Sequence, residues 1–223
     1  MNPPTIDLSF PHRWEAEILP ARPLILPPRH FVYPRAAEEV ERGALEVLAR
    51  PKFVAIPELG APEPALSLSK GLPVLETWDT KALSPDPSVS NPQPFLATCA
   101  LGFRDPAVPT GLWSTPKPED LCAVSGGYAY IIDTTAPERF TMIEYRPVLA
   151  VRPIVALALI LFVGHHSIVA WGRNGEAWRS PKLSDEGVTI TSIEDTALHG
   201  VGWEMTTDKE TPFTLDLRNG QCH

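Results

Sequence analysis

Hydrophobic and polar residues follow a strand-like pattern over the second half of the chain. Short apolar runs rich in β-branched and aromatic side chains alternate there with turn-forming residues. The runs are Phe95–Leu101, Cys122–Val124, Tyr128–Asp133, Thr141–Tyr145, Val148–Val151, Ile154–Val163, Ser167–Trp171, Val188–Ile193, Leu198–Met205 and Phe213–Leu217. Asn174-Gly175, a strong hairpin signal, separates two tryptophan-bearing runs. The pattern predicts an antiparallel β domain over residues 96–223.

One segment, residues 36–50, has apolar positions at helical spacing. Glutamates occupy its first turn, and Pro51 follows its last residue. The apolar positions are Ala37, Val40, Ala44, Val47 and Leu48. The sequence therefore predicts one N-terminal helix that packs against the rest of the protein.

The first half of the chain is rich in proline: most of the 26 prolines lie before residue 118. Residues 1–35 mix prolines with large apolar side chains, which predicts an extended arm lying along its own domain or a partner. Residues 51–95 read as a proline-rich connection. The fold class we expect is mainly β: an antiparallel two-sheet sandwich or a partial propeller, with one helix and this proline-rich arm.

Two segments of the β region resemble each other at a constant separation of 65 residues. The matched pairs are Trp113 with Trp178, Thr115 with Ser180, Pro116 with Pro181, Lys117 with Lys182 and Asp120 with Asp185. Residues 100–220 weakly resemble β-propeller blades, because a strand-turn-strand carries a tryptophan and a closing strand ends in "DLRNG". Two units are too few for a whole propeller, so the resemblance implies a two-sheet sandwich or a partial propeller completed by another chain; chance similarity is the alternative.

Residues 65–71, "ALSLSKG", contain Ser67-Leu68-Ser69-Lys70, which fits the S-x-x-K motif of serine acyltransferases. The companion S-D-N and K-T-G motifs do not occur, and Gly71 and Pro73 interrupt the helix that the motif needs. The segment resembles instead the translation of a short palindromic DNA repeat of bacterial genomes. That resemblance implies a bacterial source and a tolerant surface loop without chemistry.

The net charge and the cysteine content exclude several classes of partner and of site. The net charge of −8 and the pI near 5.2 argue against nucleic acid and anionic lipid surfaces. Cys99, Cys122 and Cys222 are too few and scattered for a disulfide framework or a zinc site, and no signal peptide is recognisable. We expect a cytoplasmic protein with no cofactor and no metal. The apolar run Ile154–Gly164 is too short for a membrane span and predicts buried strands instead.

Ser125 in "CAVSGG" is the best candidate nucleophile. It follows an apolar strand as in the G-x-S-x-G elbow, but strand residues follow where the elbow needs a helix. A small serine hydrolase would use Ser125 with His165, His166 or His199 as base. The two adjacent histidines could also bind a metal with His199 and Asp208, although no spacing fixes such a site; a polar turn is the alternative.

Acidic residues and tryptophans also gather toward the C-terminus, as in carbohydrate sites. They are Glu176, Asp185, Glu186, Glu204 and Asp208, with Trp171, Trp178 and Trp203. Tyr128 and Tyr130 share one strand face beside Gly126-Gly127 and would suit a binding surface; core packing is the alternative for these aromatic side chains.

No complete catalytic constellation is recognisable, so the favoured hypothesis is a non-catalytic β module. It would bind a protein partner or its own copies, with Tyr128, Tyr130, Trp171 and Trp178 as candidate binding residues. The alternatives are the Ser125 hydrolase and a carbohydrate-binding or glycosidase-type site.

Overall fold

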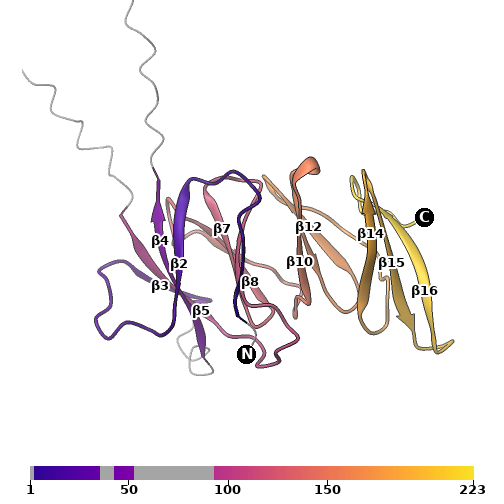
Figure 1. Ribbon diagram of the computed structural model, residues 1–223, viewed down its shortest axis with the longest axis horizontal. Helices are drawn as coiled ribbons and strands as arrows, with labels where there is room; N and C mark the ends of the chain where they lie inside the picture. The colour runs from indigo at the N-terminus through magenta and orange to yellow at the C-terminus, as the bar shows by residue number, and fades with distance from the viewer. Residues whose placement is uncertain (1–2, 36–42, 53–92) are drawn as a thin grey trace, which may run out of the picture. The chain divides into compact units, whose positions relative to one another are not determined.

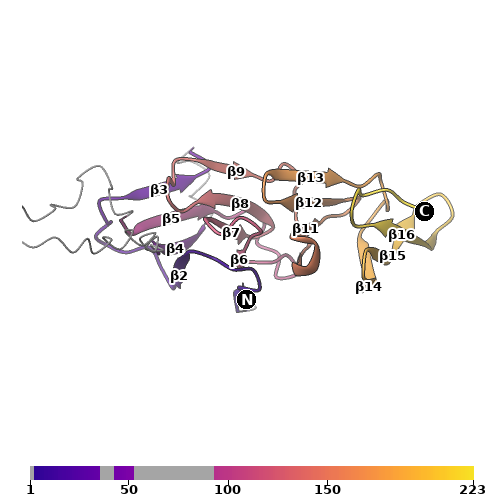
Figure 2. The ribbon, with the colours of Figure 1, turned by 90° about the horizontal axis from the view of Figure 1, so that it is seen from above.

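The computed structural model describes residues 3–35, 43–52 and 93–223, and these form strands in four separate sheets (Figures 1 and 2). Sheet 1 has the order β2-β4-β5-β3, and sheet 2 the order β1-β6-β7-β8-β9. Sheet 3 is the meander β10-β11-β12-β13, and sheet 4 is β14-β15-β16. The protein is thus mainly β, as the sequence predicts, and none of the four sheets is closed.

Sheets 1 and 2 are mixed because two strands from the N-terminal segment join them in parallel. Strand β3 runs parallel to β5, and β1 runs parallel to β6. The strands of sheet 1 are β2 (Trp14–Leu19), β3 (His30–Tyr33), β4 (Ala44–Pro51) and β5 (Phe95–Ala100). Those of sheet 2 are β1 (Thr5–Asp7), β6 (Gly111–Ser114), β7 (Asp120–Ser125), β8 (Tyr128–Asp133) and β9 (Phe140–Met142).

Sheets 3 and 4 are fully antiparallel. The predicted hairpin at Asn174-Gly175 is present: Gly172 of β12 pairs with Gly175 of β13, so Arg173 and Asn174 form its two-residue turn. Sheet 3 consists of β10 (Ala150–Ile154), β11 (Leu159–Val163), β12 (Ile168–Gly172) and β13 (Gly175–Arg179), with the short 3-10 helix η2 (Val155–Leu157) between β10 and β11. Sheet 4 consists of β14 (Val188–Glu194), β15 (Ala197–Glu204) and β16 (Lys209–Asp216).

Three hydrophobic cores join the sheets in series. Core 1 lies between sheets 1 and 2, core 2 between sheets 2 and 3, and core 3 between sheets 3 and 4. Alternate residues of β7 therefore enter different cores: Leu121 and Ala123 enter core 1, whereas Cys122 and Val124 enter core 2. In β11, Ile160 and Phe162 likewise enter core 2 while their neighbours enter core 3.

The predicted helix over residues 36–50 is wrong. Residues 44–51 form strand β4, which pairs with β2 on one side and β5 on the other, and residues 36–42 lie outside the described part. Leu45, Val47 and Ala49 alternate into core 1, so the period of two decides the structure. Pairing on both edges of the strand outweighs the helix propensity of its alanine, leucine and glutamate residues.

The apolar run at residues 154–163 forms the end of β10, η2 and β11. In the described part of the chain, no helix is long and apolar enough to cross a membrane. Residues 5–7, 14–19 and 30–33 of the proline-rich N-terminal segment lie in sheets 1 and 2. Most of the 51–95 connection, including Ser67, Ser69 and Lys70, lies outside the described residues.

Gly164, directly after β11, leaves room for the Tyr145 ring. The phenolic oxygen of Tyr145 accepts hydrogen bonds from the backbone N–H groups of His166 (2.6 Å) and Ser167 (3.2 Å). A Cβ atom at Gly164 would lie 1.5 Å from a ring carbon of Tyr145. The ring therefore holds the turn between β11 and β12 only when residue 164 has no side chain.

We predict that Gly164→Ala lowers the free energy of unfolding by about 1–3 kcal/mol, because the Tyr145 ring must move and its two hydrogen bonds weaken. Urea denaturation measures the change. Gly172→Ala is the matched control, since its Cβ would meet its nearest neighbour at an ordinary 3.7 Å. Equal losses in the two variants would contradict the assignment.

Candidate functional site

A groove lies where the connections of sheets 2 and 3 meet. It consists of two adjoining hollows of about 540 and 450 Å³ that share Lys117, Asp120, Thr141 and Trp171. We call it the Trp171 groove. The larger hollow extends over the β12–β13 turn at Arg173 and Asn174, and the smaller extends to residues after β3 and β8; its further charged residues are Arg35, Asp133, Glu138 and Arg139.

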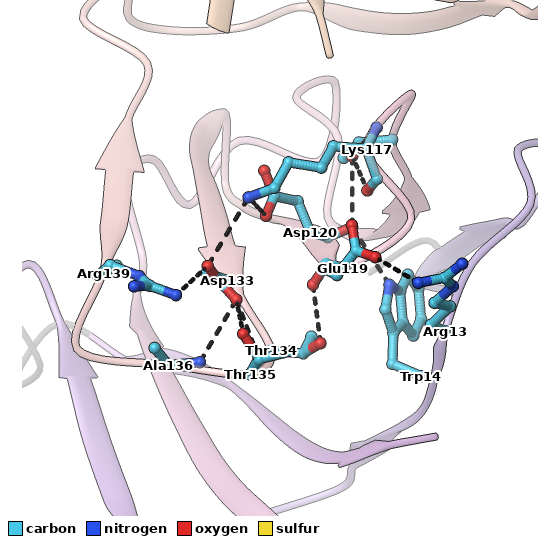
Figure 3. A network of polar contacts seen from close by, with 11 residues as sticks. Arg13, Trp14, Lys117, Glu119, Asp120, Asp133, Thr134, Thr135, Ala136 and Arg139 are labelled. Atoms are coloured by element: carbon cyan, nitrogen blue, oxygen red, sulfur yellow. Dashed lines mark hydrogen bonds and ion pairs between the residues drawn. The ribbon is translucent and has the colours of Figure 1, made fainter. Parts of the chain in front are cut away.

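Lys117 is the centre of the charge network in the groove (Figure 3). Its Nζ lies 2.7 Å from Oδ1 of Asp120 and 3.7 Å from Oδ2 of Asp133, which are cross-strand neighbours on β7 and β8. Arg139 Nη2 lies 2.8 Å from the same oxygen of Asp133. Two cations therefore compensate two carboxylates at the end of sheet 2.

Hydrogen bonds between side chains and backbone groups hold the connections around this network (Figure 3). Asp133 Oδ1 accepts hydrogen bonds from the N–H groups of Thr135 (3.0 Å) and Ala136 (3.3 Å) and from the Thr135 hydroxyl (2.6 Å). On the β7 side, Trp14 Nε1 donates to the carbonyl of Asp120 at 3.2 Å. These hydrogen bonds hold the backbone from which the charged side chains of the network extend.

The two aspartates have opposite pKa shifts. Burial raises the pKa of Asp120 above its usual value, and this outweighs the hydrogen bond from Lys117. Burial would also raise the pKa of Asp133, but hydrogen bonds from Thr135 and Arg139 lower it below the usual value. At Lys117 burial opposes the charged form, yet contact with Asp120 and Asp133 raises its pKa overall.

Trp171 forms the apolar wall of the groove. It is partly exposed and packs against core 2 from strand β12. Arg173, in the turn that follows, is exposed and makes no ion pair with any described residue. The groove therefore combines an aromatic surface, a compensated charge network and an arginine with free hydrogen-bond donors. Of these residue types, tryptophan and arginine are enriched at protein interfaces.

The two similar segments of the sequence form the same ion pair in different places. Lys182 contacts Asp185 as Lys117 contacts Asp120, three residues apart in each case. The first segment joins β6 to β7 within sheet 2, whereas the second leads from β13 of sheet 3 to β14 of sheet 4. The two ion pairs therefore lie in connections of different kinds, one within a sheet and one between two sheets.

Ser125, the candidate nucleophile, lies at the end of β7 and is fully buried. Its Oγ atom has no hydrogen-bond partner in the described part of the structure. His165 and His166 lie in the turn between β11 and β12, where the backbone carbonyl of Ser184 lies 3.1 Å from Nδ1 of His166. His199 lies on β15 with Nδ1 3.0 Å from Thr214 Oγ1. Because Ser125 Oγ has no partner among the described residues, none of the three imidazoles is hydrogen-bonded to it.

The four candidate binding residues separate into buried and accessible ones. Tyr130 is fully buried in core 1 and donates a hydrogen bond to the carbonyl of Ala100, and Trp178 is buried in core 3. Tyr128 is partly exposed under the Arg146 guanidinium, which lies 5.3 Å from the ring centre. Trp171 alone among the four lines a groove described above.

The acids expected for a carbohydrate site are also divided. Glu176 forms an ion pair with Arg179 on β13, and Asp185 pairs with Lys182. Two hollows of about 340 and 310 Å³ lie beside Trp203; the first is lined by Glu186 and Glu210, and the second includes Asp185 and Glu204. Asp208 lies in the β15–β16 turn.

A hydrogen-bonded chain across sheet 1 joins Glu46, Thr98 and His30. The Thr98 hydroxyl donates to Oε2 of Glu46 at 2.6 Å, and Nε2 of His30 lies 2.8 Å from the same hydroxyl oxygen. Because the hydroxyl has one proton and donates it to Glu46, His30 must donate from Nε2. This chain is not evident from the sequence, because the pattern around Glu46 predicts a helix and not a strand.

Among the described residues, no three His, Cys, Asp or Glu side chains are grouped so that they could hold a metal ion. No protein-family model matches the chain, and no curated protein is detectably similar to it.

We predict that Lys117→Met lowers the free energy of unfolding by about 1–2 kcal/mol, because two carboxylates on neighbouring strands lose their shared cation. Lys182→Met is the matched control; its side chain is 64% exposed, against 35% for Lys117, and removing it should cost less than about 0.5 kcal/mol. Urea denaturation of both variants tests this difference. Equal costs would show that the Lys117 network is no more than a surface ion pair.

We predict a pH dependence of stability from His30. Burial and the charge of Arg22 lower its pKa below 6.5, although Glu46 acts in the opposite direction. The unfolded chain then binds more protons than the folded one, so stability is full above pH 6.5 and falls as the pH decreases toward the folded pKa. Urea denaturation at several pH values should show a smaller decrease for His30→Gln than for the wild type, and identical decreases would contradict the prediction.

Proposed function

We propose that the protein is a non-catalytic, propeller-like binding module that holds a segment of a partner protein in the Trp171 groove. The observation that carries the proposal is the partly exposed Trp171 beside Arg173, next to the network of Lys117. Tryptophan and arginine are the residue types that most often dominate the binding energy of protein interfaces. A preformed, rigid backbone around them reduces the ordering cost of association.

The partial propeller is the form of the fold that we favour over a two-sheet sandwich. Four sheets of mostly consecutive strands pack in series through three cores, whereas a sandwich has two sheets and one core. In this interpretation the groove lies between loops of two neighbouring blades, sheets 2 and 3. We keep the cytoplasm as the proposed location, and the partner is a foreign protein or a second copy of the chain.

The carbohydrate alternative has one observation in its favour, which is the opposite pKa shift of Asp120 and Asp133 in a groove with a tryptophan. Lys117, however, contacts both carboxylates, and Asp133 Oδ1 already accepts three hydrogen bonds. This arrangement favours a structural network over an acid and a nucleophile facing a sugar. The Ser125 hydrolase needs a base within hydrogen-bonding reach, and none of His165, His166 or His199 has that contact.

Affinity purification tests the proposal, with the mass of the complex measured by light scattering. The wild type should retain a protein partner in fixed stoichiometry, and Trp171→Ala should weaken that complex by about thirtyfold or more, as truncation of a dominant interface residue does. Met205→Ala is the control, because Met205 is an exposed apolar residue outside the groove and should leave the complex unchanged. A complex that Trp171→Ala leaves intact would contradict the proposal.

A further inference from the structure

The face of sheet 4 that points away from core 3 is a second accessible surface. Leu198 of β15 points into core 3, so the alternating residues His199, Val201 and Trp203 point to the other face. All three are partly exposed. Their cross-strand partners on β14 and β16 include Thr189, Glu210, Pro212 and Thr214. The central strands of sheets 2 and 3 bury both faces in cores, whereas these side chains of sheet 4 stay accessible.

Part of this face is hollow. Trp203 and Val201 line a depression of about 340 Å³ together with Thr189, Glu210 and the Glu186-Gly187 turn. Trp203 lies directly opposite Glu210 in the register of β15 and β16. The backbone around the indole is held by Ser184, whose hydroxyl oxygen accepts from the N–H of Trp203 at 2.8 Å. The indole is thus presented from a strand held by hydrogen bonds, in a hollow that is also lined by Glu186 and Glu210.

The charges of the hollow are uncompensated. Glu186 and Glu210 form no ion pair with any described residue, and no lysine or arginine lines the hollow. This contrasts with the Trp171 groove, where two cations neutralise Asp120 and Asp133. A cation over the indole face would gain both a cation–π contact and the attraction of two carboxylates.

We propose that this face docks an extended segment of a partner protein whose lysine or arginine side chain covers Trp203 between Glu186 and Glu210. Charge complementarity selects this occupant over a second copy of the chain, because a copy placed face to face would oppose carboxylates to carboxylates. Trp203, Val201 and Pro212 supply the apolar contact, and the two glutamates supply the charge preference. The surface is separate from the Trp171 groove, so the inference does not depend on the function proposed for that groove.

The probes are synthetic peptides of alternating glycine with arginine, lysine or glutamate, titrated calorimetrically into the full-length protein. The arginine or lysine peptide should bind, and the glutamate peptide should not. Trp203→Ala and the double variant Glu186→Gln/Glu210→Gln should each weaken binding about tenfold or more. The matched control is Glu15→Gln/Glu17→Gln, which removes the same charge from exposed positions of sheet 1 and should keep wild-type affinity.

Three outcomes would overturn the inference: no binding of either cationic peptide to the wild type, unchanged affinity in Trp203→Ala, or an equal loss in the sheet 1 control, which would indicate non-specific attraction. A wild-type dimer that Trp203→Ala dissociates would assign the face to a second copy and also overturn it. Trp171→Ala should bind the cationic peptides like the wild type. Failure of this inference is therefore distinguishable from failure of the proposed function, which Trp171→Ala tests in the purified complex.

Discussion

Burial of both faces of the central strands of sheets 2 and 3 is the constraint on which the rest of the structure depends. Each of these sheets contributes alternate residues to two cores, so a strand such as β7 or β11 has no exposed face. A polar side chain within either strand would lie in an apolar core and need its own hydrogen-bond partner. The continuous apolar run before His165, which has the composition of a short membrane segment, follows directly from this arrangement.

The same constraint determines where chemistry can occur. Because the central strands of the middle sheets are apolar between their ends, charged groups lie at strand ends, in connections, on edge strands such as β10 and β13, or on outward faces. The Lys117 network begins where β7 starts and β8 ends, and the Glu46–Thr98–His30 chain lies on sheet 1, whose other face contains core 1. Both are held by strand register, which fixes the relative positions of side chains from segments distant in sequence.

The sequence was sufficient for the β class, most strands after residue 95 and the Asn174-Gly175 hairpin, because those segments carry local strand and turn signals. Strand β4 was predicted incorrectly, since its alternation of Leu45, Val47 and Ala49 is masked by residues that also favour helices. Trp171 is a candidate binding residue from its type alone, and the structure shows that it lines the groove. Asp133 and Arg139 are not candidates from the sequence, because their role depends on which strand neighbours β7, and cross-strand pairing cannot be derived from local pattern.

The parallel pairing of β1 with β6 has a consequence for synthesis on the ribosome. Residues 5–7 pair with residues 111–113, and the N–H of Phe10 donates to the Ser114 hydroxyl at 2.9 Å. Residues 5–7 must therefore wait until more than a hundred further residues have been translated before their native partner exists. Until then the apolar side chains of this segment are available to chaperones, whereas sheets 3 and 4, built from adjacent hairpins, can pair as soon as each hairpin emerges.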